Sequence, residues 1–257
     1  MRQMTESDRP RRHDQSSGLV PNATEWGMPR KSFLRALLAG ATVLAPFTKT
    51  ARAEARRPGV ILNPSPTQTY APTRIMAIRH AEKPVGQSNG IDGFGNPDST
   101  SLIPQGWQRA GALVPLFGSS FGALPTPSYL FAPNIADSVT SRRPFETITP
   151  LAAALGITIN AAPGAVTPGQ YDAADYPAMV SAALTCPGVV LIAWEHEAIP
   201  LIGNTILGNA TAVPQTWPSA RFDIVWIFDL NPTTNVYTFN QAPQLLLQGD
   251  LPFPISH

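Results

Sequence analysis

Two apolar runs, each followed at once by charged side chains, constrain the fold of this chain most strongly. Residues 74–79 read RIMAIR and residues 188–195 read GVVLIAWE. Continuous apolar strands of this kind are typical of parallel sheets that helices cover on both faces. Segments with a helical spacing of apolar residues alternate with the strands along the chain. The sequence therefore predicts an α/β fold, a three-layer sandwich with a mostly parallel central sheet and helices on both faces.

The remaining elements follow from local patterns. Further strands are expected at residues 128–133 and 157–162, and helices at residues 104–117, 142–156, 175–185 and 197–207. Pro104 suits the first turn of a helix, and Gly156 suits a helix carboxyl-terminal cap. Residues 222–230 and 235–241, with a short turn between them, predict a late antiparallel hairpin.

The amino-terminal part has the pattern of an export signal. Basic residues precede an apolar stretch at 36–47, and an Ala-Arg-Ala cleavage pattern follows at 51–53. The apolar stretch is too short to span a bilayer comfortably. We therefore expect an exported protein, periplasmic or extracellular, with no stable membrane span after signal cleavage. The segment RKSFL resembles a twin-arginine signal with Lys31 in place of the second arginine, so the twin-arginine and general secretory routes both stay open.

Charge and composition divide the chain into a leader and one domain. Residues 1–53 carry nine Lys or Arg against four Asp or Glu, whereas residues 54–257 carry nine against thirteen. We expect a leader at 1–53, with Met28 as an alternative start, then an extended segment at 54–72 and a single domain at 73–257. A mildly acidic domain offers no basic face, so we expect no nucleic-acid partner. One cysteine, Cys186, excludes an intramolecular disulfide and a cysteine-based metal cluster.

Two histidines follow the two apolar runs at equivalent places. His80 comes directly after residues 74–79, and His196 comes directly after residues 188–195. The carboxyl ends of parallel strands meet at one edge of a sheet, where ligands bind. A single histidine at a strand end is more often structural than catalytic. Because both internal histidines of the domain lie at such ends, beside charged neighbours, the pattern favours a functional site.

The first of these segments, IRHAEKP, resembles the Arg-His-x-Glu signature of the histidine phosphatase superfamily, which has the phosphoglycerate-mutase-like fold. Three further segments match in order: LIPQGWQRAGAL with Gly106, Arg109 and Ala110, SRRPFETITPLA with Arg143 and Thr147, and VVLIAWEHEAIPLI with His196. Pro144 stands where the family usually has alanine, and the serine spacing in that segment is shorter. The resemblance covers about residues 73–204.

This resemblance implies a phosphomonoesterase in which His80 is the covalent nucleophile and forms a phosphohistidine. Arg79 and Arg143 would bind the phosphoryl oxygens through their planar guanidinium groups, and a protonated His196 would add a further donor. The simpler alternative for both arginines is solvation or a salt bridge. Because fixed cations stabilise the transferred group, we expect no metal and no cofactor, and a small phosphorylated molecule as substrate.

The resemblance leaves the proton donor for the leaving group open. The acid-phosphatase branch of the family has Asp immediately after the second histidine, where this chain has Glu197. The mutase branch uses a Glu that is missing here, since residues 147–194 hold only Asp172 and Asp175 as acids. We therefore expect Glu197 to be the general acid, with Asp172 and Asp175 as alternatives.

Two charged residues after His80 are assigned to substrate binding. We expect Glu82 to orient the site by accepting hydrogen bonds from basic neighbours. Lys83, the only lysine after the leader, either contacts the substrate phosphate or lies in solvent.

Two rival functions use the same residues. A catalytically inactive phosphate- or glycan-binding protein would keep the fold without turnover. A metal-dependent hydrolase would use His80, His196 and Glu197 as ligands.

Overall fold

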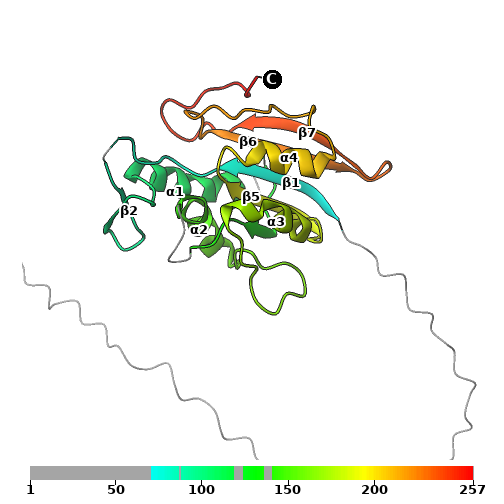
Figure 1. Cartoon of the computed structure of the whole chain (residues 1–257), viewed down its shortest axis with the longest axis horizontal. Coiled ribbons are helices and arrows are strands. Elements are labelled where there is room, and N and C mark those ends of the chain that lie inside the picture. The colour runs from blue at the N-terminus through cyan, green and yellow to red at the C-terminus, as the bar shows by residue number, and fades with distance from the viewer. Residues whose placement is uncertain (1–70, 87, 119–123, 136–140, 257) are drawn as a thin grey trace, which may run out of the picture. The chain divides into compact units, whose positions relative to one another are not determined.

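The computed structural model describes residues 71–86, 88–118, 124–135 and 141–256 of the chain (Figure 1). The expected leader, and the expected extended segment up to residue 70, lie outside the described residues. Among the helices that are described, none has both the length and the apolar character needed to cross a membrane.

A five-stranded mixed sheet with the order β4-β5-β1-β6-β7 forms the centre of the domain. Its strands are β1 (Pro72–Arg79), β4 (Tyr129–Phe131), β5 (Gly188–Trp194), β6 (Ile224–Asn231) and β7 (Val236–Pro243). Strands β4, β5 and β1 are parallel, while β6 pairs with β1 and with β7 in antiparallel fashion. The α/β class and the late hairpin are confirmed, and the parallel part of the sheet is its β4-β5-β1 half.

Helices cover both faces of this sheet because side chains alternate along each strand. Met76 and Ile78 of β1 pack with α1 (Pro104–Gly118) and α2 (Arg143–Leu155) on one face. Ile75 and Ala77 pack on the other face with α3 (Tyr176–Ala183) and α4 (Ile199–Leu207). Three short elements complete the described part: β2 (Gly90–Ile91), β3 (Pro97–Asp98) and the 3-10 helix η1 (Ala173–Asp175).

The prediction of a strand at residues 157–162 was wrong, because this segment has an irregular backbone. Asn160 adopts a left-handed backbone conformation with φ of 64°, which interrupts an extended chain and which asparagine tolerates. Its side-chain amide accepts a hydrogen bond from the Ala132 N–H (3.0 Å) and donates one to the Ala132 carbonyl (2.9 Å). A side chain thus satisfies the backbone just after β4, where the apolar run predicted a neighbouring strand.

The carboxyl ends of β1 and β5 lie side by side. Arg79 is in register with Trp194, and the N–H of His80 donates to the Trp194 carbonyl at 2.9 Å. Because β6 runs antiparallel to β1, β6 begins at the same edge. The loop at residues 218–223 leads into β6 and therefore reaches the end of β1, next to His80.

Candidate active site

The His80 imidazole is held in its neutral form. Its side chain is nearly buried, with an exposed fraction of 3% for the residue, and its Nδ1 lies 2.7 Å from the Ala81 carbonyl oxygen. Only a protonated Nδ1 makes this contact a hydrogen bond, so the free lone pair is assigned to Nε2. Burial lowers the pKa of His80 to about 3, and the charge of Arg79 acts in the same direction. At neutral pH, Nε2 is therefore unprotonated and free to attack an electrophile.

Helices α2 and α1 fix the backbone after His80. The Ala81 N–H donates to Thr147 Oγ1 at 2.8 Å, and the Thr147 hydroxyl donates to the Arg143 carbonyl at 2.7 Å. On the α1 side, Gly106 lies so close that a Cβ there would be 2.5 Å from the Glu82 carbonyl oxygen. Only glycine allows this approach, which gives a structural reason for Gly106 in the second sequence motif.

Arg79, the last residue of β1, is a fully buried cation with unused donors. Its Nη1 donates to the carbonyls of Ser219 (2.6 Å) and Arg221 (3.1 Å). Its guanidinium carbon lies 4.0 Å from the ring centroid of Phe222, and that ring also lies against the His80 imidazole, with 5.9 Å between centroids. Nε and Nη2 of Arg79 are buried and have no hydrogen-bond partner within the described part of the chain.

The charge state of Arg79 makes these two donors informative. Burial lowers the pKa of Arg79 to about 10, so the guanidinium remains protonated at neutral pH. Buried donors without partners are costly, and more so on a charged group. An anion bound at Nε and Nη2 would remove this cost.

Arg143 supplies a second guanidinium from the first turn of α2. It is half-buried, and its Nη2 donates to the Ser99 carbonyl at 2.7 Å. Glu146 holds the same loop by accepting hydrogen bonds from the Ser101 hydroxyl (2.6 Å) and the Leu102 N–H (2.9 Å). The charge of Arg143 contributes to the lowered pKa of both Arg79 and His80, after the larger effect of burial.

His196 and Glu197 lie together in the turn between β5 and α4. His196 Nδ1 is 2.7 Å from Glu197 Oε2, but the angles do not fit a hydrogen bond. Burial lowers the pKa of His196, Arg79 lowers it further, and Glu197 opposes both. The Glu197 side chain is 68% exposed. Helix α4 begins at Ile199, so Glu197 precedes the helix and does not lie in its first turn.

Glu82 and Lys83 have different surroundings. Both carboxylate oxygens of Glu82 accept hydrogen bonds from Arg109, the shortest being 2.7 Å from Nη2. Glu82 thus accepts hydrogen bonds from a basic neighbour, and its orienting role in the site stays a prediction. Lys83 is half-buried, and its charge contributes to the lowered pKa of His80 and of His196, after burial and Arg79.

The alternative proton donors have a structural role at the start of α3. Asp172 and Asp175 are both exposed, and the Asp172 N–H donates to Asp175 Oδ2 at 3.0 Å across η1. Glu197, in contrast, is adjacent to His196 and acts on the pKa of Arg79.

Some contributors to the site were not predicted from the sequence. The loop at 218–223 provides Phe222 and two backbone carbonyls, and no motif marks it, because carbonyl groups are independent of residue type. Arg109 was part of a motif but had no assigned role, although its charge inside an apolar helix face was a usable signal. The described residues contain no group of three or more His, Cys, Asp and Glu side chains arranged to hold a metal ion.

Comparisons with known proteins give partial similarities to solved structures. No family model and no curated protein matches the chain. A mycobacterial glucosyl-3-phosphoglycerate phosphatase in complex with VO3 matches 66% of this chain and 97% of its own, with 11% identity and a TM-score of 0.37. A proposed alpha-ribazole-5′-phosphate phosphatase from Escherichia coli matches 66% of this chain and 95% of its own, with 13% identity and a TM-score of 0.40.

A proposed phosphohistidine phosphatase SixA from Agrobacterium tumefaciens matches 66% of this chain and 96% of its own, with 16% identity and a TM-score of 0.38. These three TM-scores are below 0.5, so the function is argued from this chain's own residues.

Proposed function

We propose that the protein is a phosphomonoesterase of the histidine phosphatase type, which hydrolyses phosphate esters through a phosphohistidine on His80. The observation that carries the proposal is the buried pair of His80 and Arg79. A neutral imidazole with a free Nε2 lies beside a charged guanidinium whose Nε and Nη2 have no hydrogen-bond partner among the described residues. A phosphoryl group supplies what both lack, an electrophilic phosphorus and several anionic oxygens.

In the first step, Nε2 of His80 attacks phosphorus and the ester oxygen leaves. Arg79 and Arg143 hold the phosphoryl oxygens, and the carboxylic acid of Glu197 donates its proton to the departing oxygen. The hydrogen bond from Nδ1 to the Ala81 carbonyl stabilises the positive charge that the phosphorylated imidazole gains.

In the second step, water attacks phosphorus and the N–P bond breaks. The Glu197 carboxylate accepts the proton of that water, and His80 returns to its neutral form with phosphate as product. The exposure of Glu197 gives water and the leaving group access to the carboxylate. Together with the leader expected at residues 1–53, the proposal places this activity outside the cytoplasm.

Hydrolysis of p-nitrophenyl phosphate by the wild type and by His80→Ala tests the proposal. We expect turnover by the wild type and a loss of at least about 10³-fold in the variant, because the covalent route is removed. Asp229→Asn, which changes a charge at the opposite end of β1, is the matched control and should keep wild-type turnover.

The same assay also distinguishes the proposed phosphatase from a catalytically inactive binding protein of the same fold. Such a protein would bind phosphate with no turnover above buffer, and His80→Ala would not change the rate. Equal rates in wild type and variant would therefore reject the phosphatase.

A further inference from the structure

We propose that Arg109 and Asp250 are positioning residues for the candidate active site. Through them, the carboxyl-terminal segment, residues 244–256, sets the geometry of His80 and Arg79. This inference rests on the proposed phosphatase function. It assigns a role in turnover to a segment that follows the last strand and holds none of the expected catalytic residues.

The first link runs from the carboxyl-terminal segment to the loop after His80. Arg109 Nη2 lies 2.7 Å from Glu82 Oε1 and 2.6 Å from Asp250 Oδ1. The Arg109 and Asp250 side chains are only 3% and 5% exposed. Arg109 Nη1 also donates to Gln244 Oε1 at 3.0 Å. One buried guanidinium thus joins Glu82, two residues after the nucleophile, to two residues of this segment.

Asp250 also folds the carboxyl-terminal segment on itself. Its Oδ2 accepts hydrogen bonds from the N–H groups of Leu246 (2.7 Å) and Leu247 (3.1 Å). Burial alone would raise the pKa of Asp250, but the hydrogen bonds from Arg109 and these amides outweigh it and lower the pKa. The carboxylate is therefore charged at neutral pH, and every partner that it has is a donor.

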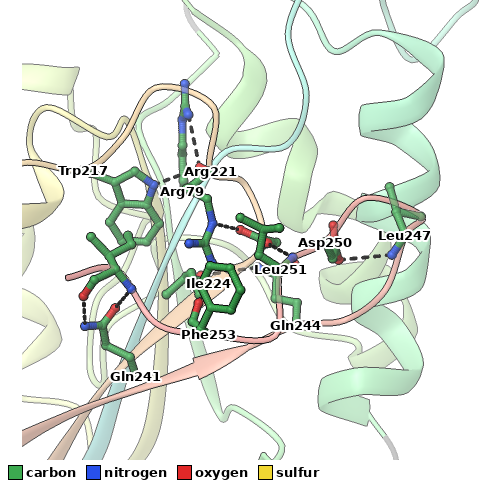
Figure 2. A network of polar contacts seen from close by, with 12 residues as sticks. Arg79, Trp217, Arg221, Ile224, Gln241, Gln244, Leu247, Asp250, Leu251 and Phe253 are labelled. Carbon is green, nitrogen blue, oxygen red and sulfur yellow. Dashed lines mark hydrogen bonds and ion pairs between the residues drawn. The ribbon is translucent and has the colours of Figure 1, made fainter.

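The second link runs from the same segment to the loop that holds Arg79 (Figure 2). The Leu251 N–H donates to Asp223 Oδ2 at 2.7 Å, and Arg221 Nη2 donates to the Phe253 carbonyl at 2.8 Å. Arg221 Nε donates to Asp223 Oδ1 at 2.7 Å, which closes this part of the network. The Arg221 carbonyl is one of the two that hold Arg79.

The two links lead to two consecutive residues of the chain, Arg79 and His80. One link holds the loop after His80 through Glu82, and the other holds Arg79 through the loop at 218–223. Residues of both links line one cleft of about 410 Å³, among them Glu82, Asp223 and Asp250. Because the space between them is not filled by packed side chains, the polar network fixes their spacing.

Asp250→Asn tests this role with little change in volume. The asparagine amide nitrogen is a donor, and it would face Arg109 or the backbone N–H groups that Asp250 now accepts from. The variant leaves the Arg109–Glu82 pair and all expected catalytic residues in place. Asp229→Asn is the matched control, since it also removes a carboxylate from an arginine pair, here the Arg74–Asp229 pair of the β1–β6 ladder near the start of β1.

With p-nitrophenyl phosphate, we expect kcat of Asp250→Asn to fall about 10- to 100-fold with little change in KM, because a small misplacement of reacting groups costs rate. Inhibition by vanadate, which can adopt the geometry of the transition state, should weaken by a similar factor, whereas inhibition by inorganic phosphate should change less. Asp229→Asn should keep all three values. A general loss of folding would change the active fraction and leave the two inhibition constants unaltered.

A folded Asp250→Asn with wild-type kcat and wild-type vanadate inhibition would overturn the inference. If that variant does not fold, Gln244→Leu provides the test, because it removes an acceptor of Arg109 without changing any charge. We expect it to lower kcat in the same way but by less, and an unchanged kcat would again overturn the inference. A wild type that neither turns over substrate nor binds vanadate would instead reject the proposed function itself.

Discussion

The two ends of β1 each carry an arginine, and the two side chains differ in burial and in their partners. Arg74, near the start of the strand, forms an ion pair with Asp229 of β6, and the side chains are 30% and 41% exposed. Arg79, at the end, is 0% exposed, and its partners within the described part of the chain are carbonyl oxygens and an aromatic ring. The same residue type on one strand is thus neutralised at one end and left with buried, unused donors at the other.

Under the proposed function, this difference separates a structural charge from a functional one. A half-exposed ion pair contributes little to folding and needs nothing further. A buried guanidinium without a carboxylate lowers stability unless something else uses its donors. Such a cost is typical of positions where a ligand completes the site, and it points to the carboxyl end of β1 as the anion-binding end.

The largest effect expected from this contrast comes from exchanging each arginine for lysine. Arg79→Lys keeps a charge but loses the planar donors, so kcat/KM for p-nitrophenyl phosphate should fall about 10³-fold. Arg74→Lys should leave kcat/KM unchanged. Equal effects of the two exchanges on kcat/KM would contradict the distinction between the two arginines.

The next largest effect concerns the proton donor. Glu197→Gln should lower the turnover of an alkyl phosphate about 10²-fold, because the poor leaving group needs the proton. The loss should be much smaller with p-nitrophenyl phosphate, whose leaving group departs as the anion. Asp172→Asn serves as the control and should change neither rate. A large loss in Asp172→Asn with none in Glu197→Gln would assign the acid to the start of α3 instead.

An effect of a different kind is expected on the pH dependence of stability. The pKa of His80 is about 3 in the folded protein, against an ordinary value of 6.5. Between these two values the unfolded chain binds a proton that the folded protein does not. The free energy of unfolding should therefore decrease as pH falls from 6.5 towards 3, by at most about 1.4 kcal/mol per pH unit from this group.

Urea denaturation of the wild type and His80→Asn over this pH range measures that contribution. The variant should show a shallower dependence on pH, since it lacks the titrating imidazole. Identical slopes would show that His80 is not held neutral by burial.

The smallest effect is expected at the start of β1. Asp229→Asn breaks the Arg74 pair and should lower the free energy of unfolding by no more than about 1 kcal/mol, because both groups are partly exposed and screened by solvent. Turnover should be unchanged. A loss of activity in this variant would show that the two ends of β1 are coupled.

Much of the fold was predictable because it depends on local patterns. Local patterns predicted the strands β1 and β5 from their apolar runs, and β6 and β7 from a hairpin pattern. Packing in the core stabilises the same elements. The strand expected at 157–162 failed because a single side chain, Asn160, satisfies the backbone beside β4. A pattern of apolar residues does not show where a side-chain amide makes the hydrogen bonds that a neighbouring strand would otherwise make.

The candidate site was predictable where residue type determines chemistry. The sequence predicted His80 and His196 at one edge of the sheet, because each follows an apolar strand. In the structure they follow β1 and β5, whose carboxyl ends lie side by side. The role of Phe222 and the link from Arg109 to Asp250 depend on contacts across more than 130 residues of chain, which no local pattern records.

The most direct test of the central claim is to trap the covalent intermediate. The wild type is mixed with ³²P-labelled substrate, quenched within milliseconds under alkaline conditions that preserve phosphohistidine, and digested, and the labelled peptide is sequenced. The account predicts label on His80, and none in Arg79→Lys at the same time point. Rapid turnover with no labelled protein, or label on any other residue, would contradict it.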